Sequence, residues 1–124
     1  MERAKILVID DDPICSGLLL AILGDDYQVI SVNTGGGGID AIDSLNPDLI
    51  LLDITMPQVN GYQVIKHLKA DSSKSAIPII VISSLVEPSD KEFALELGAD
   101  DYITKPVMPT TVQSKIEKYF KSNG

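Results

Sequence analysis

The feature of the sequence that most restricts the fold is a run of branched apolar residues at positions 49–52, which ends on the carboxylate of Asp53. The turn pair Asn46-Pro47 precedes the run, and Pro57 follows it closely. Because the run is uniformly apolar and does not alternate, it predicts a strand buried on both faces, as in parallel sheets covered by helices. Open α/β sheets place reactive groups where such strands end. Asp is also a common turn residue, so Asp53 alone does not establish a site.

The rest of the chain alternates between short apolar runs and helical patterns. We expect strands at residues 5–9, 27–32, 48–53, 77–83 and 99–104. We expect helices at residues 13–23, 39–45, 61–70, 89–97 and 109–120, the fourth opened by the capping-box pattern of residues 89–92. Strands that alternate with helices predict an α/β fold with a parallel sheet. Five such units favour a flavodoxin-like, doubly wound (βα)5 fold of strand order 2-1-3-4-5, with helices on both faces and residues 1–124 in one domain.

Composition narrows the classes of function. The net charge of −8 argues against unaided binding to nucleic acid or to an anionic membrane. No apolar run approaches the roughly 20 residues that span a bilayer, and no long apolar segment precedes Asp10, so we expect no signal peptide. The single cysteine, Cys15, cannot form an internal disulfide, which favours a reducing, cytoplasmic location. We interpret Cys15 as a small helix residue, since no histidine motif accompanies it.

Four consecutive glycines, Gly35 to Gly38, precede the second expected helix. A glycine run before a helix can cradle a phosphate, but no Gly-Lys-Ser/Thr follows it. A dinucleotide fingerprint would follow the first strand, where Asp10-Asp11-Asp12 stands instead. We therefore expect the four glycines to form a flexible loop and a frayed helix start, because each glycine costs roughly 0.5–1 kcal/mol in a helix.

Polar side chains stand where the expected strands end. They are Asp10 and Asp11 after the first strand, Asp53 on the third, Ser83 and Ser84 on the fourth, and Lys105 after the fifth. Strand order 2-1-3-4-5 has its switch point between the first and third strands, so these groups are expected to meet at one edge of the sheet.

Three carboxylates in one place repel each other. At ~5 Å and an effective dielectric constant near 20, one pair costs about 3 kcal/mol. Proton uptake or a divalent cation can relieve this repulsion, and oxygen ligands alone favour Mg²⁺ over zinc. The hydroxyl of Ser83 and the ammonium of Lys105 would complete a site able to hold a phosphoryl group. The chemistry predicted is transfer of a phosphoryl group to Asp53 as the nucleophile.

With these pieces in place, the chain resembles the receiver domain of two-component response regulators, and in particular the single-domain chemotaxis regulator. The resemblance rests on residues 6–13, residues 48–57 with Gly61, residues 77–83 and residues 98–106, in order and at the spacing of the family. The four glycines depart from the family pattern, and Ser83 stands where threonine is commoner.

The resemblance implies a role for each matching residue. Asp53 would accept phosphate from a phosphohistidine on a histidine kinase or a histidine phosphotransfer protein. Mg²⁺ would be bound by Asp11, Asp53 and the main-chain carbonyl of Thr55, with Asp10 acting through water. Lys105 would contact the phosphoryl oxygens, and the Lys105-Pro106 peptide bond would be cis. Ser83 and Tyr102 would be the switch residues that change the surface offered to a downstream output protein or effector domain.

Two other functions compete with this signalling switch, which would catalyse only its own phosphorylation and dephosphorylation. A phosphatase of the haloacid-dehalogenase type needs an Asp-x-Asp pair, but Thr55 stands at the second position and cannot supply the proton. A degenerate receiver that only binds partners would lack at least one of the three acids, the hydroxyl of Ser83 or Lys105. All of these residues are present. His67 has no second histidine near it in the sequence and is interpreted as a surface residue.

The first helix carries no charged residue, which suggests a docking surface for the phosphodonor. We expect Ile14, Leu18 and Ile22 to face the sheet, which leaves Leu19, Leu20 and Leu23 as a partly exposed strip. A contiguous apolar strip beside Asp10–Asp12 would suit a protein that brings its histidine to Asp53.

Overall fold

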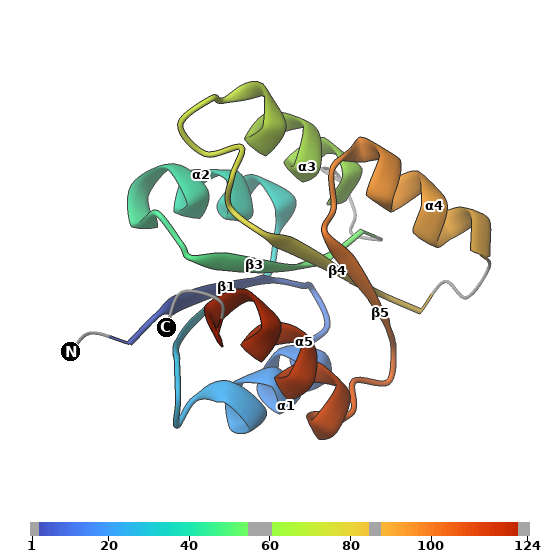
Figure 1. The fold of residues 1–124 in the computed structure, drawn as a ribbon. Helices are drawn as coiled ribbons and strands as arrows, with labels where there is room; N and C mark the ends of the chain where they lie inside the picture. Colours follow the sequence, from blue (N-terminus) through green and yellow to red (C-terminus); the bar gives the residue numbers. More distant parts are fainter. Residues whose placement is uncertain (1–2, 55–60, 85–87, 122–124) are drawn as a thin grey trace.

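The computed structural model of the protein describes residues 3–54, 61–84 and 88–121. Strands and helices alternate along the chain (Figure 1). The strands are β1 (Lys5–Ile9), β2 (Gln28–Val32), β3 (Leu49–Asp53), β4 (Ile79–Ser83) and β5 (Asp101–Thr104). The helices are α1 (Pro13–Leu23), α2 (Gly35–Leu45), α3 (Gly61–Ala70), α4 (Pro88–Leu97) and α5 (Pro109–Lys121).

The strands form one parallel sheet in the order β2-β1-β3-β4-β5, which confirms the predicted flavodoxin-like topology. Every residue of β3 and of β4 is buried, as their uniformly apolar sequences predicted. The register pairs Ile9 with Leu52 and Asp53 with Ile82. The carboxyl ends of these central strands therefore lie side by side at one edge of the sheet.

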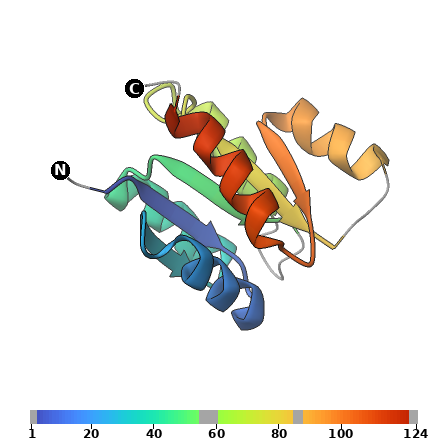
Figure 2. The same ribbon diagram turned by 60° about the horizontal axis from the view of Figure 1, so that its bottom comes forward.

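Helices cover both faces of the sheet and create two hydrophobic cores. α2, α3 and α4 lie over one face, and their core includes Ile42, Ile65 and Ala94 (Figure 1). α1 and α5 lie together on the other face, with Leu19 and Ile116 in its core (Figure 2). None of the helices in the described part of the chain is long and apolar enough to span a bilayer.

Several strands begin later than the sequence predicted, because turns take up the first backbone donors. The N–H of Tyr27 donates to Leu23 O at the end of α1, so β2 begins at Gln28. The N–H of Ile77 donates to Lys74 O in the preceding turn, and the N–H of Ala99 donates to Ala94 O of α4, so β4 and β5 each begin two residues later. β3 begins at Leu49, one residue inside its predicted range. Apolar composition located the strands, but hydrogen bonding in the turns sets their first residues.

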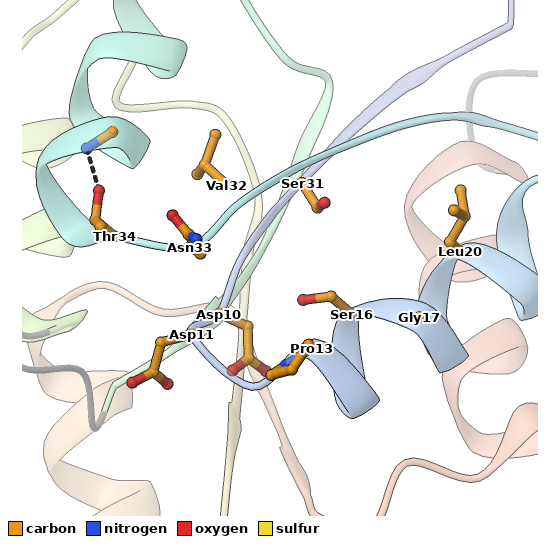
Figure 3. Close-up of a pocket in the computed structure, with 11 residues that line it drawn as sticks. Asp10, Asp11, Pro13, Ser16, Gly17, Leu20, Ser31, Val32, Asn33 and Thr34 are labelled. Carbon is orange, nitrogen blue, oxygen red and sulfur yellow. Dashed lines mark hydrogen bonds between the residues drawn. The ribbon is translucent and has the colours of Figure 1, made fainter.

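The expected loop at Gly35 to Gly38 is wrong, because all four glycines belong to α2. Thr34 is the N-cap, and its side-chain oxygen accepts a hydrogen bond of 2.9 Å from the N–H of Gly37 (Figure 3). Gly38 is buried against Ile9, where an added Cβ would lie 2.6 Å from Ile9 Cδ1. The cap and the close approach of α2 to β1 therefore offset the poor helix propensity of glycine.

The predicted faces of α1 are also wrong. Cys15, Leu19 and Leu23 face the sheet and are buried, whereas Ile14 and Leu18 are 74% and 44% exposed. Leu20, at 54% exposed, lies on the surface as expected. No side of the helix carries a charged residue, so its sequence contains two comparable apolar strips at helical spacing and does not indicate which one packs on the sheet.

α4 begins at Pro88, so Ser89 lies inside the helix and is not its N-cap, contrary to the capping-box prediction. Proline suits a first helical position because the N–H that it lacks has no partner within the helix. Ala94 is the buried residue of α4, so this helix is more weakly anchored than α3, which buries Val64, Ile65 and Leu68.

The glycines of α2 give a matched test of this packing. Gly36→Ala should raise the free energy of unfolding by about 0.5–1 kcal/mol, because no atom lies within 4 Å of the added Cβ and alanine favours the helix. Gly38→Ala should instead lower it by about 1 kcal/mol, because the methyl group would overpack the fully buried Ile9. Urea unfolding of both variants checks the pair. Equal stabilisation by the two substitutions would show that α2 does not pack tightly on β1.

Candidate functional site

Three carboxylates gather at the carboxyl edge of the central strands. Asp10 and Asp11 follow β1, and Asp53 ends the neighbouring β3. Each offers one carboxylate oxygen, and these oxygens lie within 4.8 Å of one another. Asp10 and Asp53 are each 3% exposed, whereas Asp11 is exposed. The pairing of β1 with β3 therefore brings together the acids that the sequence placed at separate strand ends.

Lys105 brings a positive charge into this group from the end of β5. Its Nζ lies 3.3 Å from Asp10 Oδ2, 3.4 Å from Asp53 Oδ2 and 3.7 Å from Asp12 Oδ2. Burial by itself would lower the pKa of Lys105, but the negative charges of Asp53 and Asp10 outweigh burial and raise this pKa. Lys105 therefore remains an ammonium ion among the carboxylates.

The backbone fixes the position of Lys105. Its N–H donates a hydrogen bond of 2.8 Å to Ser83 O, which continues the pairing of β5 with β4. The Lys105-Pro106 peptide bond is cis. The side chain of Lys105 consequently starts beside β4 and reaches the carboxylates at the ends of β3 and β1.

Asp10 is incompletely compensated. Its Oδ1 accepts a hydrogen bond of 2.9 Å from the N–H of Asp12. Its Oδ2 is buried and accepts no hydrogen bond in the described part of the chain, although the Lys105 ammonium lies nearby as an ion-pair partner. Burial raises the pKa of Asp10, and the charge of Asp53 raises it further. A cation at the three carboxylates would satisfy this oxygen, and donors that are all oxygen suit a hard divalent ion.

Cys15 lies beside this acidic group on the first turn of α1. It is buried, and burial together with the neighbouring Asp10 carboxylate raises the pKa of its thiol to about 12. The thiol therefore stays protonated near neutral pH, which agrees with its interpretation as a small helix residue. His67 lies on α3, away from the acidic edge of the sheet, and its ring is 3.5 Å from the carboxylate of Asp43 on α2.

The other residues that the sequence singled out occupy different depths. Ser83 is fully buried at the end of β4, where it pairs with Thr104, and Ser84 is exposed. Tyr102 is 8% exposed and belongs to the core beneath α4, with Ala94 and Val81. Thr55, expected to offer its main-chain carbonyl, lies outside the described residues.

Two residues contribute more to the site than the sequence suggested. Asp12 caps α1 through the N–H of Ile14, as predicted, but its second oxygen also faces Lys105. Gly61 packs directly on the end of β3, where an added Cβ would overlap the backbone of Ile54 and lie 2.6 Å from Asp53 O. The glycine that follows shortly after Asp53 was the signal in the sequence for the close approach of α3 to β3. The sequence analysis interpreted that glycine only as part of a turn.

Solvent reaches the acidic edge through a hollow of about 680 Å³ between α1 and the start of α2 (Figure 3). Asp10 and Asp11 lie at its border, and the glycines Gly17 and Gly37 line its sides. Because neither glycine has a side chain, no side chain from these two positions fills the hollow.

Repulsion within the acidic group predicts that removing one charge stabilises the metal-free protein. Asp11→Asn should raise the melting temperature without Mg²⁺ by about 2–4 °C, because one carboxylate no longer faces Asp10 and Asp53. Thermal unfolding in a chelating buffer measures the change. Asp25→Asn, at an exposed turn position after α1, is the control that makes the same change in net charge. A lower melting temperature for Asp11→Asn than for the control would contradict repulsion at this edge.

Comparison with known proteins gives the same assignment as the geometry. The family model of the response regulator receiver domain matches residues 6–117. The protein PilH of Pseudomonas aeruginosa is 38% identical over 114 residues, which cover 91% of this chain and 94% of PilH. The DNA-binding response regulator MtrA of Mycolicibacterium smegmatis is 34% identical over 122 residues, which cover 98% of this chain and 52% of MtrA. The chain thus spans nearly the whole of PilH but about half the length of MtrA.

A solved structure agrees with these relatives. The signal receiver domain of a signal transduction histidine kinase from Syntrophus aciditrophicus has a TM-score of 0.87 and 32% identity, over 96% of this chain and 91% of that one. The family model covers well over half of the sequence, and the acids at the ends of β1 and β3 lie within the matched residues. The chain therefore belongs to the family of response regulator receiver domains.

Proposed function

We propose that this protein is a phosphorylation-dependent signalling switch in which Asp53 accepts a phosphoryl group from a phosphohistidine. The observation that carries the proposal is the buried carboxylate of Asp53, with two further acids within 4.8 Å and the ammonium of Lys105 at 3.4 Å. A carboxylate oxygen of Asp53 attacks phosphorus, and the bond from phosphorus to the histidine nitrogen breaks. The imidazole leaves with the electron pair of that bond and takes up a proton, and Asp53 becomes an acyl phosphate.

We propose Mg²⁺ as the cofactor of this transfer. Asp11 and Asp53, with the main-chain carbonyl of Thr55, would hold the ion, and Asp10 would act through water. The fit rests on the oxygen-only donor set and on the buried Asp10 Oδ2, which accepts no hydrogen bond from the described residues. When bound, Mg²⁺ neutralises charge that would otherwise repel an incoming phosphoryl group.

Lys105 and Ser83 are proposed to hold the transferred group. The ammonium of Lys105 lies between the carboxylates of Asp10 and Asp53, so a phosphoryl group on Asp53 can exchange one of these ion pairs for its own oxygens. Ser83 ends the strand next to β3 and carries a hydroxyl able to donate to a phosphoryl oxygen. Both groups stabilise negative charge on the phosphoryl group once it is on Asp53.

Ser83 and Tyr102 are proposed to pass the signal to the surface formed by α4, β5 and α5. Tyr102 is paired with Val81, two residues before Ser83 on β4. Its ring is already buried beneath α4, so a shift of Ser83 toward the phosphoryl group would change the packing between Tyr102 and Ala94. The occupancy of Asp53 would thereby alter the surface read by a downstream output protein or effector domain.

The proposed phosphodonor is a histidine kinase or a histidine phosphotransfer protein that docks on α1. A second hollow, of about 340 Å³, lies between α1 and the residues after β5, and Ile14, Leu18 and Val107 line it. It reaches Lys105 and Asp12, so a helix seated there would bring a histidine close to the acidic edge. Ile14 and Leu18 therefore take the place of Leu19 and Leu23, which are buried, as the proposed docking residues, and Leu20 is exposed as predicted but lines the other hollow.

We further propose that residues 1–124 form one receiver domain acting in the cytoplasm, with no direct contact to nucleic acid or membrane. The net charge of −8 supports this proposal, because it disfavours approach to both polyanions.

The central test is phosphorylation by a small donor. Acetyl phosphate with Mg²⁺ should add one phosphoryl group to the protein, and Asp53→Asn should abolish the addition because the nucleophile is lost. Lys105→Ala should slow it by about 10²-fold or more, because a preorganised charge is removed from the transferred oxygens. Intact mass spectrometry over time measures both. Asp48→Asn, an exposed acid at the opposite end of the sheet, is the control and should react at the wild-type rate.

Undiminished phosphorylation of Asp53→Asn would refute Asp53 as the acceptor. If excess chelator does not slow the phosphorylation of the wild-type protein, the metal requirement is refuted, but the role of Asp53 as the acceptor is not.

Docking on α1 is tested separately from chemistry. Leu18→Glu should slow transfer from a phosphorylated histidine phosphotransfer protein about tenfold or more, because the charge interrupts the apolar hollow beside Lys105. The rate with acetyl phosphate should not change, since that donor needs no docking surface. Leu20→Glu is the matched control, because Leu20 lines the other hollow, between α1 and α2. Equal slowing by Leu18→Glu with both donors would argue against docking at this position.

A further inference from the structure

One aromatic contact bridges α3 and α4 at the surface. The ring of Tyr62 lies 4.7 Å from the ring of Phe93, centroid to centroid, at an interplanar angle of 63°. This edge-to-face arrangement is favourable for aromatic pairs. α3 and α4 lie next to each other on the same side of the sheet (Figure 1). Phe93 is nevertheless 48% exposed, so its ring is held mainly from one side.

The contact matters for α4 because little else anchors this helix. Ala94 is the buried residue of α4, and Leu97 is partly buried against the same core. Alanine buries only a small apolar area. Phe93 is the α4 residue whose ring has an aromatic partner in the described part of the chain. Loss of the Tyr62 contact would leave α4 with few constraints on its position.

The other end of the contact leads to the phosphoacceptor strand. Gly61 is the first residue of α3, and its N–H donates a hydrogen bond of 3.3 Å to Ile54 O. An added Cβ on Gly61 would lie 2.6 Å from Asp53 O, so the start of α3 rests directly on the backbone at the end of β3. Tyr62 follows Gly61 and must move with it. A displacement of the backbone at Asp53 would therefore reach the Tyr62 ring through rigid contacts.

Tyr62 also packs against the hydrophobic core that contains Tyr102 of β5 and Ala94 of α4. Burial raises the pKa of its phenol, and Tyr102 on β5 and Asp90 on α4 raise it further.

We propose that the Tyr62–Phe93 contact couples the backbone at Asp53 to the position of α4, as a path separate from Ser83 and Tyr102. The inference rests on the proposed role of Asp53 as the phosphoacceptor. In this proposal α3 transmits the signal, and Phe93 receives it on α4, the helix that borders the output surface.

A contact transmits a signal only if its free energy differs between the two states of Asp53, and linkage makes this coupling reciprocal. Removing Phe93, which lies on α4 and not at the site, should then change the affinity of Asp53 for a phosphoryl mimic. Aromatic pairs are worth enough to change such an equilibrium by about two- to tenfold. A contact that only stabilises the fold would leave this affinity unchanged.

The experiment is a double-mutant cycle on the affinity for beryllofluoride with Mg²⁺, measured by NMR titration of the Ile54 amide. Tyr62→Leu and Phe93→Leu should each change the dissociation constant by about two- to tenfold in the same direction. The double variant should change it no further, because both substitutions remove one interaction. Tyr62→Phe, which keeps the ring, and Leu95→Ala, on another side of α4, should bind with wild-type affinity. Dispersed amide spectra check that each variant is folded. If Tyr62→Leu does not fold, Phe93→Leu is compared with Tyr62→Phe, because Phe93 is partly exposed and its replacement disturbs the core less.

Wild-type affinity in both leucine variants would overturn the coupling, and so would independent effects that multiply in the double variant. Either result would leave the proposed function intact, because beryllofluoride would still bind. A wild-type protein that binds no beryllofluoride would overturn the proposed function and the coupling with it.

Discussion

The close approach of buried carboxylates around one ammonium ion is the interaction on which the rest of this structure depends. Asp10 and Asp53 are almost completely buried, and Lys105 lies within 3.4 Å of both. One ammonium ion cannot neutralise the several acids at this edge, and Asp10 keeps an oxygen that accepts no hydrogen bond from the described residues. The fold holds this arrangement in place because Asp53 ends the fully buried strand β3, which lies between β1 and the fully buried β4. A divalent cation at these three carboxylates would relieve the repulsion that the ammonium ion leaves.

The same edge is linked to the surface through backbone contacts. Lys105 is tied to Ser83 by the pairing of β5 with β4, and Gly61 rests on the backbone of Asp53 and Ile54. α4 is the most weakly anchored neighbour of these elements, since Ala94 is its buried residue. A change at Asp53 therefore meets a rigid sheet on one side and a lightly held helix on the other. In the proposed coupling, α4 is the element that moves, because it is the least anchored of these neighbours.

The sequence predicted the strands and the acidic edge well, because both follow from local composition and parallel topology. Uniformly apolar runs identify β3 and β4, and strand order alone places Asp10 beside Asp53. Lys105 was predictable for the same reason, as a residue at a strand end. The first residues of β2, β4 and β5 were not predictable, since carbonyls of the preceding helices and turns bind the backbone donors just before these strands.

Two errors had a tertiary cause. The glycines of α2 read as a loop, because their propensity is local whereas the packing of Gly38 on Ile9 is not. The buried face of α1 was misassigned because that helix has no charged residue to mark its outer side, and only its packing on the sheet shows that Cys15 and Leu19 face the core.

The most direct measurement of the central claim locates the phosphoryl group chemically. The protein is treated with acetyl phosphate and Mg²⁺, then with borohydride, which reduces an aspartyl phosphate to homoserine, and peptide mass spectrometry identifies the position. The account predicts homoserine at position 53 and nowhere else, with none formed when Mg²⁺ is withheld. Homoserine at Asp10 or Asp11 in place of Asp53, or an unmodified chain with Mg²⁺ present, would contradict it.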